Sequence, residues 1–255
     1  MTADRSLPAY LSPGAVLDRL AILELKRERV RDSEARRVAE RELASLSVAW
    51  ASTGVSTDVG PLLTINRELW ALENEVRRCE REKRFDESFV DAVRRIQRLN
   101  GERADARATV NAGVPIELVE VEAGLDSYAD QIAIGQVRAA RSAASSDIGW
   151  ETLRDIWFSY GIEDVFSSAH FGQLRHANGQ LWTVKDEVER FLSDDALSPA
   201  AIAAYRSIYL VNDARCRLKR ALAVDLSSAF YEVKSYTPYE PPADWDSAQL
   251  RFSAS

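Results

Sequence analysis

Apolar residues recur along this chain at intervals of three and four positions, the spacing that places them on one face of an α-helix. The Ser-Pro pairs Ser12-Pro13 and Ser198-Pro199 have the residue types that favour the N-cap and first turn of a helix. Residues 51–60 (ASTGVSTDVG) have the composition of a loop. The pattern therefore predicts a mainly α fold. Helices are expected to begin at Pro13, Ser33, Pro61, Glu87 (after the N-cap residue Asp86) and Pro199.

The chain also matches itself at a constant shift of 112 residues. Residues 62–78 (LLTINRELWALENEVRR) meet residues 174–190 (LRHANGQLWTVKDEVER) with seven identities in 17 positions, where ordinary residue usage gives about one. The identical residues of the first segment are Leu62, Asn66, Leu69, Trp70, Glu75, Val76 and Arg78. We therefore expect a tandem duplication, with copies at residues 11–122 and 123–237 and a polar tail at 238–255.

Each predicted copy contains three or four helices and ends in a short strand-like segment, at residues 116–121 and 230–233. These two segments are expected to pair with each other. The copies are expected to be helical-hairpin units that pack about a pseudo-twofold axis or stack as a short solenoid.

Composition and charge exclude several classes of protein. Hydrophobic residues make up 46% and charged residues 29%, as in ordinary globular proteins, and no apolar run is long enough to span a membrane. The start resembles no secretory signal, and two cysteines form no disulfide framework, so we expect a cytoplasmic protein. Residues 1–112 carry 20 basic and 19 acidic side chains, leaving 13 and 21 for the remainder, so no basic surface for nucleic acid is predicted.

Common catalytic and cofactor motifs are absent from the sequence. His170 and His176 are the two histidines, and neither has an acidic residue three positions before it, as helical di-metal sites require. Cys79 and Cys216 do not occupy equivalent positions in the two copies, which argues against zinc. No phosphate-binding loop, dinucleotide fingerprint or nucleophile elbow is present. We expect no metal and no cofactor, and the sequence favours a non-catalytic protein.

Candidate site residues come from the positions that the copies share. Asn66 and Trp70 lie one helical turn apart, as do Asn100 and Arg103 on the next helix. In an antiparallel hairpin these side chains would converge, with Asp18 as a counter-charge to Arg103. Their counterparts in the second copy are Asn178, Trp182, Asn212 and Arg215. Two interpretations stay open: a buried hydrogen-bond network that fixes the helices, or a site for a small polar or anionic ligand.

Glu24 and Lys26 on the first predicted helix are further candidates for ligand binding. The second copy has Gln136 in place of Glu24, and Gly135 in place of Leu23. An acid or base at Glu24 would therefore be missing from the second copy. The sequence for this reason favours the first copy as the one with a working site.

Three segments together carry a resemblance to a known family: residues 12–30 (SPGAVLDRLAILELKRERV), 65–70 (INRELW) and 85–111 (FDESFVDAVRRIQRLNGERADARATVN). They resemble a family of small uncharacterised bacterial helical proteins. Members typically carry one copy that ends in Glu-Glu-Lys-Ser-Tyr, and this chain has YEVKSY at residues 231–236. The resemblance implies a helical cytoplasmic module found near or fused to glycosyltransferases for surface polysaccharides.

Two functional hypotheses follow, and a third is weaker. The first is a non-catalytic helical repeat protein that binds a partner, such as a glycosyltransferase, or a sugar-related ligand in surface-polysaccharide biosynthesis. The alternative is an enzyme that acts on a small anionic or sugar substrate at the Asn, Trp, Arg and Asp cluster. The third is a regulatory module or adaptor, suggested by the amphipathic helices. Formation of a homodimer stays open.

Overall fold

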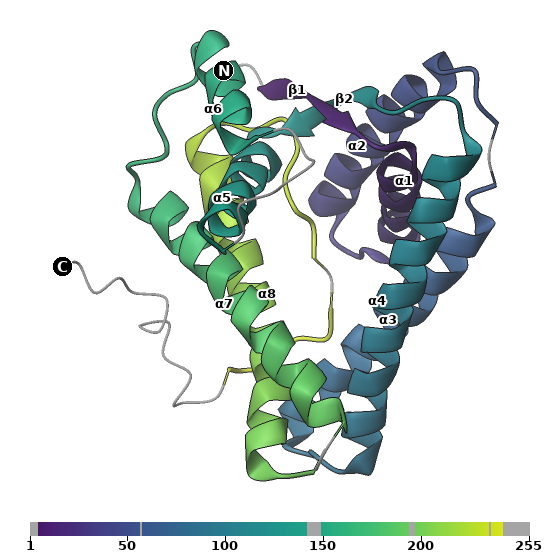
Figure 1. The fold of residues 1–255 in the computed structure, drawn as a ribbon, viewed down its shortest axis with the longest axis vertical. Coiled ribbons are helices and arrows are strands. Elements are labelled where there is room, and N and C mark those ends of the chain that lie inside the picture. Colours follow the sequence, from purple (N-terminus) through teal and green to yellow (C-terminus); the bar gives the residue numbers. More distant parts are fainter. Residues whose placement is uncertain (1–4, 57, 142–148, 194–196, 235, 242–255) are drawn as a thin grey trace. The chain divides into compact units, whose positions relative to one another are not determined.

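A computed structural model describes residues 5–56, 58–141, 149–193, 197–234 and 236–241. The fold is mainly α, with helices and one two-stranded sheet in the described part of the chain (Figure 1). The elements in chain order are β1 (Ser6–Leu11), α1 (Pro13–Arg29), α2 (Ser33–Ser52), α3 (Gly60–Glu82), α4 (Glu87–Gly113), β2 (Val119–Gly124), α5 (Leu125–Arg141), α6 (Trp150–Ser159), α7 (Ala169–Ser193) and α8 (Pro199–Asp225).

The helix starts follow the predicted capping residues. The Asp86 carboxylate accepts a hydrogen bond from the backbone N–H of Phe89 over 3.3 Å at the start of α4. The Ser198 hydroxyl accepts one from the N–H of Ala201 over 3.2 Å at the start of α8. α2 extends to Ser52, so the loop before α3 is shorter than the composition suggested.

The chain divides into two compact units between Glu122 and Ala123. The first unit comprises residues 8–122 together with residues 233–240, and therefore contains α1 to α4 and a segment near the C-terminus. The second unit comprises residues 123–232 with residues 5–7 and 241 among the described ones, and contains α5 to α8. Residues 233–237, which the sequence assigned to the second copy, thus belong to the first unit. The tandem duplication stays a prediction.

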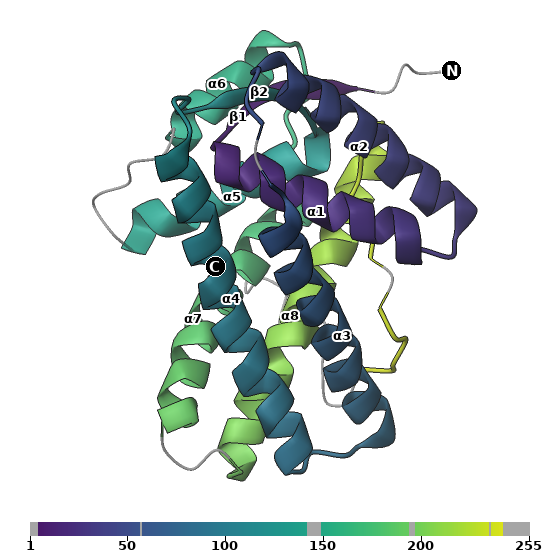
Figure 2. The same cartoon turned by 90° about the vertical axis from the view of Figure 1, so that its right-hand side faces the viewer.

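In the first unit, α1 packs against the other three helices, and α3 and α4 form a long hairpin (Figure 2). Buried Leu17, Ala21 and Leu62 form the centre of this packing. Gly14 lets α1 approach α4 closely, because a Cβ atom there would lie 2.3 Å from the carbonyl oxygen of Arg107.

In the second unit, α7 and α8 lie side by side, and α5 packs against α6, α7 and α8 (Figure 1). Gly135, which stands 112 positions after Leu23, has a packing reason for being glycine. A Cβ atom at Gly135 would lie 2.7 Å from the Cβ atom of Trp150, the first residue of α6. The glycine therefore allows α6 to pack directly on α5.

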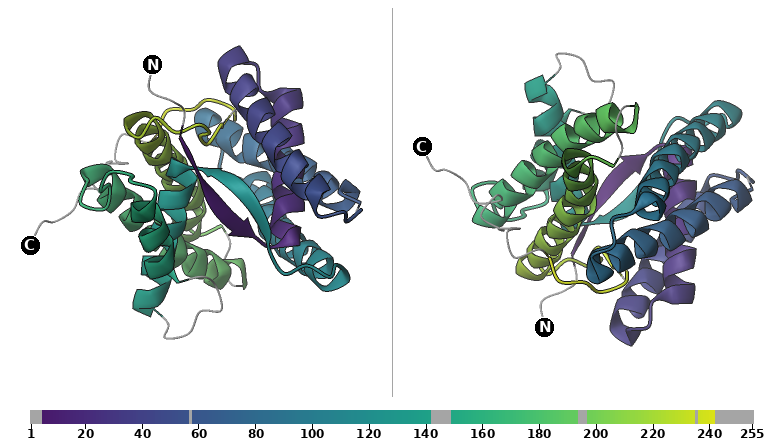
Figure 3. Two further views of the ribbon diagram at one scale, coloured as in Figure 1. Left: turned by 90° about the horizontal axis from the view of Figure 1, so that it is seen from above. Right: turned by 90° about the horizontal axis from the view of Figure 1, so that it is seen from below.

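The predicted pairing of the two strand-like segments is wrong. β2 pairs instead with β1, a strand that the sequence analysis did not identify (Figure 3). Residues 230–233 form no strand. The N–H of Glu232 donates to the Asp126 carboxylate over 3.3 Å, and Arg5 forms an isolated parallel bridge with Ser228.

Candidate functional site

Four of the predicted site residues of the first unit converge, namely Asp18, Asn66, Asn100 and Arg103. Asn66 donates a hydrogen bond to the Oδ1 atom of Asp18 over 2.8 Å. Arg103 donates to the Oδ1 atom of Asn66 over 3.3 Å and to that of Asn100 over 3.0 Å. The Asp18 and Asn66 residues are buried, at 7% and 4% exposed. Trp70 packs against Tyr236.

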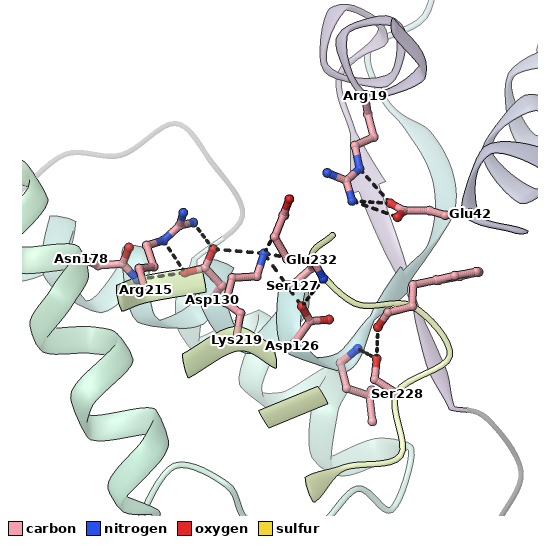
Figure 4. Close-up of polar contacts among 12 residues, drawn as sticks. Arg19, Glu42, Asp126, Ser127, Asp130, Asn178, Arg215, Lys219, Ser228 and Glu232 are labelled. Atoms are coloured by element: carbon pink, nitrogen blue, oxygen red, sulfur yellow. Dashed lines mark hydrogen bonds and ion pairs between the residues drawn. The ribbon is translucent and has the colours of Figure 1, made fainter. Parts of the chain in front are cut away.

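A similar arrangement lies in the second unit at positions 112 residues later, where the arginine bonds directly to the aspartate (Figure 4). Asn178 donates to the Oδ1 atom of Asp130 over 3.0 Å. Arg215 donates to both carboxylate oxygens of Asp130 and, over 3.5 Å, to Asn212. Burial acts to lower the pKa of Arg215, but the neighbouring negative groups, Asp130 first among them, together outweigh this effect and the pKa is raised.

These two clusters act as interhelical hydrogen-bond networks. The first connects α1, α3 and α4, and the second connects α5, α7 and α8. A buried carboxylate is costly unless it is paired, and each aspartate here has an asparagine and a nearby cation. Arg107 lies 4.0 Å from Asp18, and Lys219 lies 3.8 Å from Asp130. The geometry therefore favours the network interpretation over a ligand site at these residues.

Sequence reasoning missed an extension of the second cluster around Lys219 (Figure 4). The Lys219 Nζ atom lies 3.4 Å from a carboxylate oxygen of Glu232, 3.3 Å from the Ser127 hydroxyl and 4.0 Å from Asp126. Asp126 is fully buried, and this burial raises its pKa to about 6. The first copy has Gly14 at the position of Asp126, so a search for shared residues could not find this group. Its helical spacing from Asp130 is the signal that could have done so.

The remaining first-helix candidates lie elsewhere. Glu24 forms an ion pair with Arg27 on the same helix, and Lys26 is buried at 4% exposed. The rings of Trp70 and Trp182 each have an arginine beside them. The Arg29 guanidinium lies 5.8 Å from the centre of the Trp70 ring, and that of Arg141 lies 5.9 Å from the Trp182 ring.

A cavity of about 710 Å³, widely open to solvent, lies between α5, α7 and α8 in the second unit. Its lining includes the cationic or titratable side chains of Arg141, Arg175 and His176 and the carboxylate of Glu187. Arg141 donates to the Thr183 hydroxyl over 2.8 Å, and Arg175 donates to the side-chain oxygen of Gln136 over 3.5 Å. None of the residues predicted as site residues lines this cavity.

The cavity is lined by small or uncharged residues where the positions 112 residues earlier carry charged side chains. In the first unit Glu28 on α1 and Arg67 on α3 form an ion pair at 3.2 Å. The residues 112 positions later are Ala140 and Gly179, and both line the cavity. A Cβ atom at Gly179 would meet no atom within 4 Å beyond its own helix, which confirms that this position has free space.

A second ion pair of the first unit also has no charged counterparts 112 positions later. Arg95 and Glu68 form an ion pair between α4 and α3 in the first unit. Their counterparts Ser207 and Gln180 line the cavity with a short and an uncharged side chain. These changes from charged to small or uncharged residues are visible in the sequence when the differing positions of the two predicted copies are compared. A comparison of identical positions does not find them.

Other features limit the kinds of site that the described residues can form. Among the residues that the structure describes, no group of three or more His, Cys, Asp or Glu side chains is placed to hold a metal ion. None of the described helices combines the length and apolar character needed to cross a membrane. Comparison of the chain with protein-family models, with curated proteins and with solved structures finds no match.

Proposed function

We propose that this protein is a non-catalytic helical binding protein of surface-polysaccharide assembly that holds a small anionic, sugar-related ligand in the cavity of the second unit. The observation that carries the proposal is the cavity itself, whose volume of about 710 Å³ is typical of small-molecule sites. The link to surface polysaccharides and to the cytoplasm comes from the family resemblance of the sequence.

The lining chemistry supports an anionic ligand. Arg141 and Arg175 carry two positive charges against the single negative charge of Glu187. A guanidinium group binds phosphate or carboxylate through paired, charge-assisted hydrogen bonds. Gln180 and Thr183 add groups that can bond to hydroxyls, as a sugar requires. A sugar phosphate combines both kinds of group in one molecule.

The alternative of an enzyme at the Asn, Trp, Arg and Asp cluster receives less support. Asp18 and Asn66 are almost inaccessible to a substrate and bond to each other. The Trp70 ring contacts Tyr236, and no hydrogen bond between it and these two residues is found in the described part of the chain. The first unit is accordingly assigned a structural role in this proposal, and binding is assigned to the second unit.

Calorimetric titration of the full chain with glucose 1-phosphate tests the proposal, with glucose as the uncharged control. We expect saturable binding of the phosphate and weaker or no binding of glucose. Arg175→Ala should weaken the binding of glucose 1-phosphate by about tenfold, because one charge-assisted hydrogen bond is lost. Equal binding of the two sugars would contradict an anion-selective cavity.

A cavity-filling variant gives a sharper test. Ala140→Glu combined with Gly179→Arg restores in the second unit the residue types of the Glu28–Arg67 ion pair. We expect this variant to keep its thermal stability and to lose binding. The matched control, Glu28→Ala with Arg67→Ala, removes the exposed pair from the first unit and should leave affinity unchanged. Wild-type affinity in the filled variant would overturn the proposal.

A further inference from the structure

The first unit has a surface that receives a planar ring, and its occupant is part of the chain. The Tyr236 ring lies 5.3 Å from the Trp70 ring, at an interplanar angle of 54°. The Arg77 guanidinium lies 4.2 Å from the centre of the Tyr236 ring. The next residue, Thr237, donates its N–H and its hydroxyl to the Asn74 side chain over 2.7 and 3.0 Å. An aromatic ring and an adjoining polar group are therefore bound together beside the Trp70–Arg29 pair.

The second unit repeats the tryptophan and the arginine, and its tryptophan is exposed. Trp182 and Arg141 stand 112 positions after Trp70 and Arg29, with nearly the same spacing between guanidinium and ring. Trp182 is 40% exposed, a large value for a tryptophan.

Arg141 connects this exposed ring to the cavity. Its guanidinium lies beside Trp182 and also donates to Gly179 and Thr183, two residues of the cavity lining. A ligand with a ring on Trp182 would therefore meet Arg141 before it enters the cavity. A molecule suited to this order of groups has a planar ring, then negative charge, then a polar end.

We infer that the cavity takes a nucleoside diphosphate sugar, whose base stacks on Trp182 while its phosphates bind Arg141 and Arg175. This inference rests on the proposed function and adds the class of ligand. Base–aromatic stacking is tolerant of base identity because every base has a π-face. The site is therefore expected to accept the sugar nucleotides of more than one base.

Titration of the full chain with uridine diphosphate glucose, guanosine diphosphate mannose and glucose 1-phosphate tests the inference. We expect both nucleotide sugars to bind about tenfold more tightly than the sugar phosphate, as one stacked ring contributes on exposed surfaces. Trp182→Leu should remove this difference without changing the affinity for glucose 1-phosphate. Trp182→Phe should keep most of it, because a ring remains.

The matched control is Trp70→Leu, which alters the equivalent ring where Tyr236 already covers it and should leave nucleotide-sugar affinity unchanged. Equal affinity for glucose 1-phosphate and the nucleotide sugars would overturn the inference while leaving the proposed function intact. An undiminished advantage of the nucleotide sugars in Trp182→Leu would also overturn it. Failure of all three compounds to bind would overturn the proposed function as well.

Discussion

Asn66 on α3 donates a hydrogen bond to Asp18 on α1 over 2.8 Å, and both residues are buried. Asn66→Ala would leave the Asp18 carboxylate without this donor, so we expect a loss of about 1–3 kcal/mol of stability. Urea denaturation checks this value. The change should leave sugar-phosphate affinity as it is, because the cavity belongs to the second unit. Arg98→Ala, at an exposed residue of α4, is the control and should be nearly neutral.

The segment that carries Tyr236 is expected to stabilise the first unit. Tyr236→Ala removes a ring that contacts both Trp70 and Arg77, and we expect a loss of about 1–3 kcal/mol. Tyr236→Phe keeps the ring and should recover most of this loss. Thermal unfolding of the two variants measures the difference. If both variants melted at the same temperature as the wild type, the segment would contribute nothing to the stability of the unit.

The helices could be predicted because their signals are local. The capping residues Asp86 and Ser198 act within four residues of their own position, and the apolar spacing repeats over each helix. β1 is different. It contains Pro8 and only six residues, and its stability depends on β2, which lies more than a hundred residues away in the chain. The residue pattern within β1 does not indicate that β2 is its partner.

The candidate site shows the same division. The convergence of Asn66, Asn100 and Arg103 could be predicted because distance from the hairpin turn fixes which residues face each other. The cavity could not be predicted in this way, since it depends on missing bulk at positions such as Gly179 and on three helices meeting in space. Residues that are identical at the shift of 112 form the hydrogen-bond network. Residues that differ at the same shift line the cavity.

Asp126 predicts a specific dependence of stability on pH. Burial raises its pKa from 3.8 to about 6, so the folded chain binds a proton more tightly than the unfolded chain. The stabilisation from this proton is fully present below about pH 4 and is lost as the pH rises through about 6. Lys219, Glu232 and Asp130 are the charged groups that face this region.

Asp126→Asn removes the titrating group, so the variant should exceed the wild type in stability at pH 8 by about 1–3 kcal/mol. This advantage should shrink as the pH falls from about 6 to about 4. Urea denaturation at several pH values measures it, and Asp91→Asn at an exposed position is the control. A difference that stays constant between pH 4 and pH 8 would show that Asp126 titrates normally.

Gly135 is expected to be required for the packing of α6. Gly135→Leu restores the residue type of Leu23, but its Cβ atom would lie 2.7 Å from that of Trp150. We expect a loss of about 1–3 kcal/mol, because overpacking must displace α6 from α5. Gly101→Ala is the control on α4: a Cβ atom there meets nothing within 4 Å, so the variant should gain about 0.5–1 kcal/mol from helix propensity. Calorimetric melting of both variants checks the opposite signs, and a stabilised Gly135→Leu would show that α6 does not rest on this glycine.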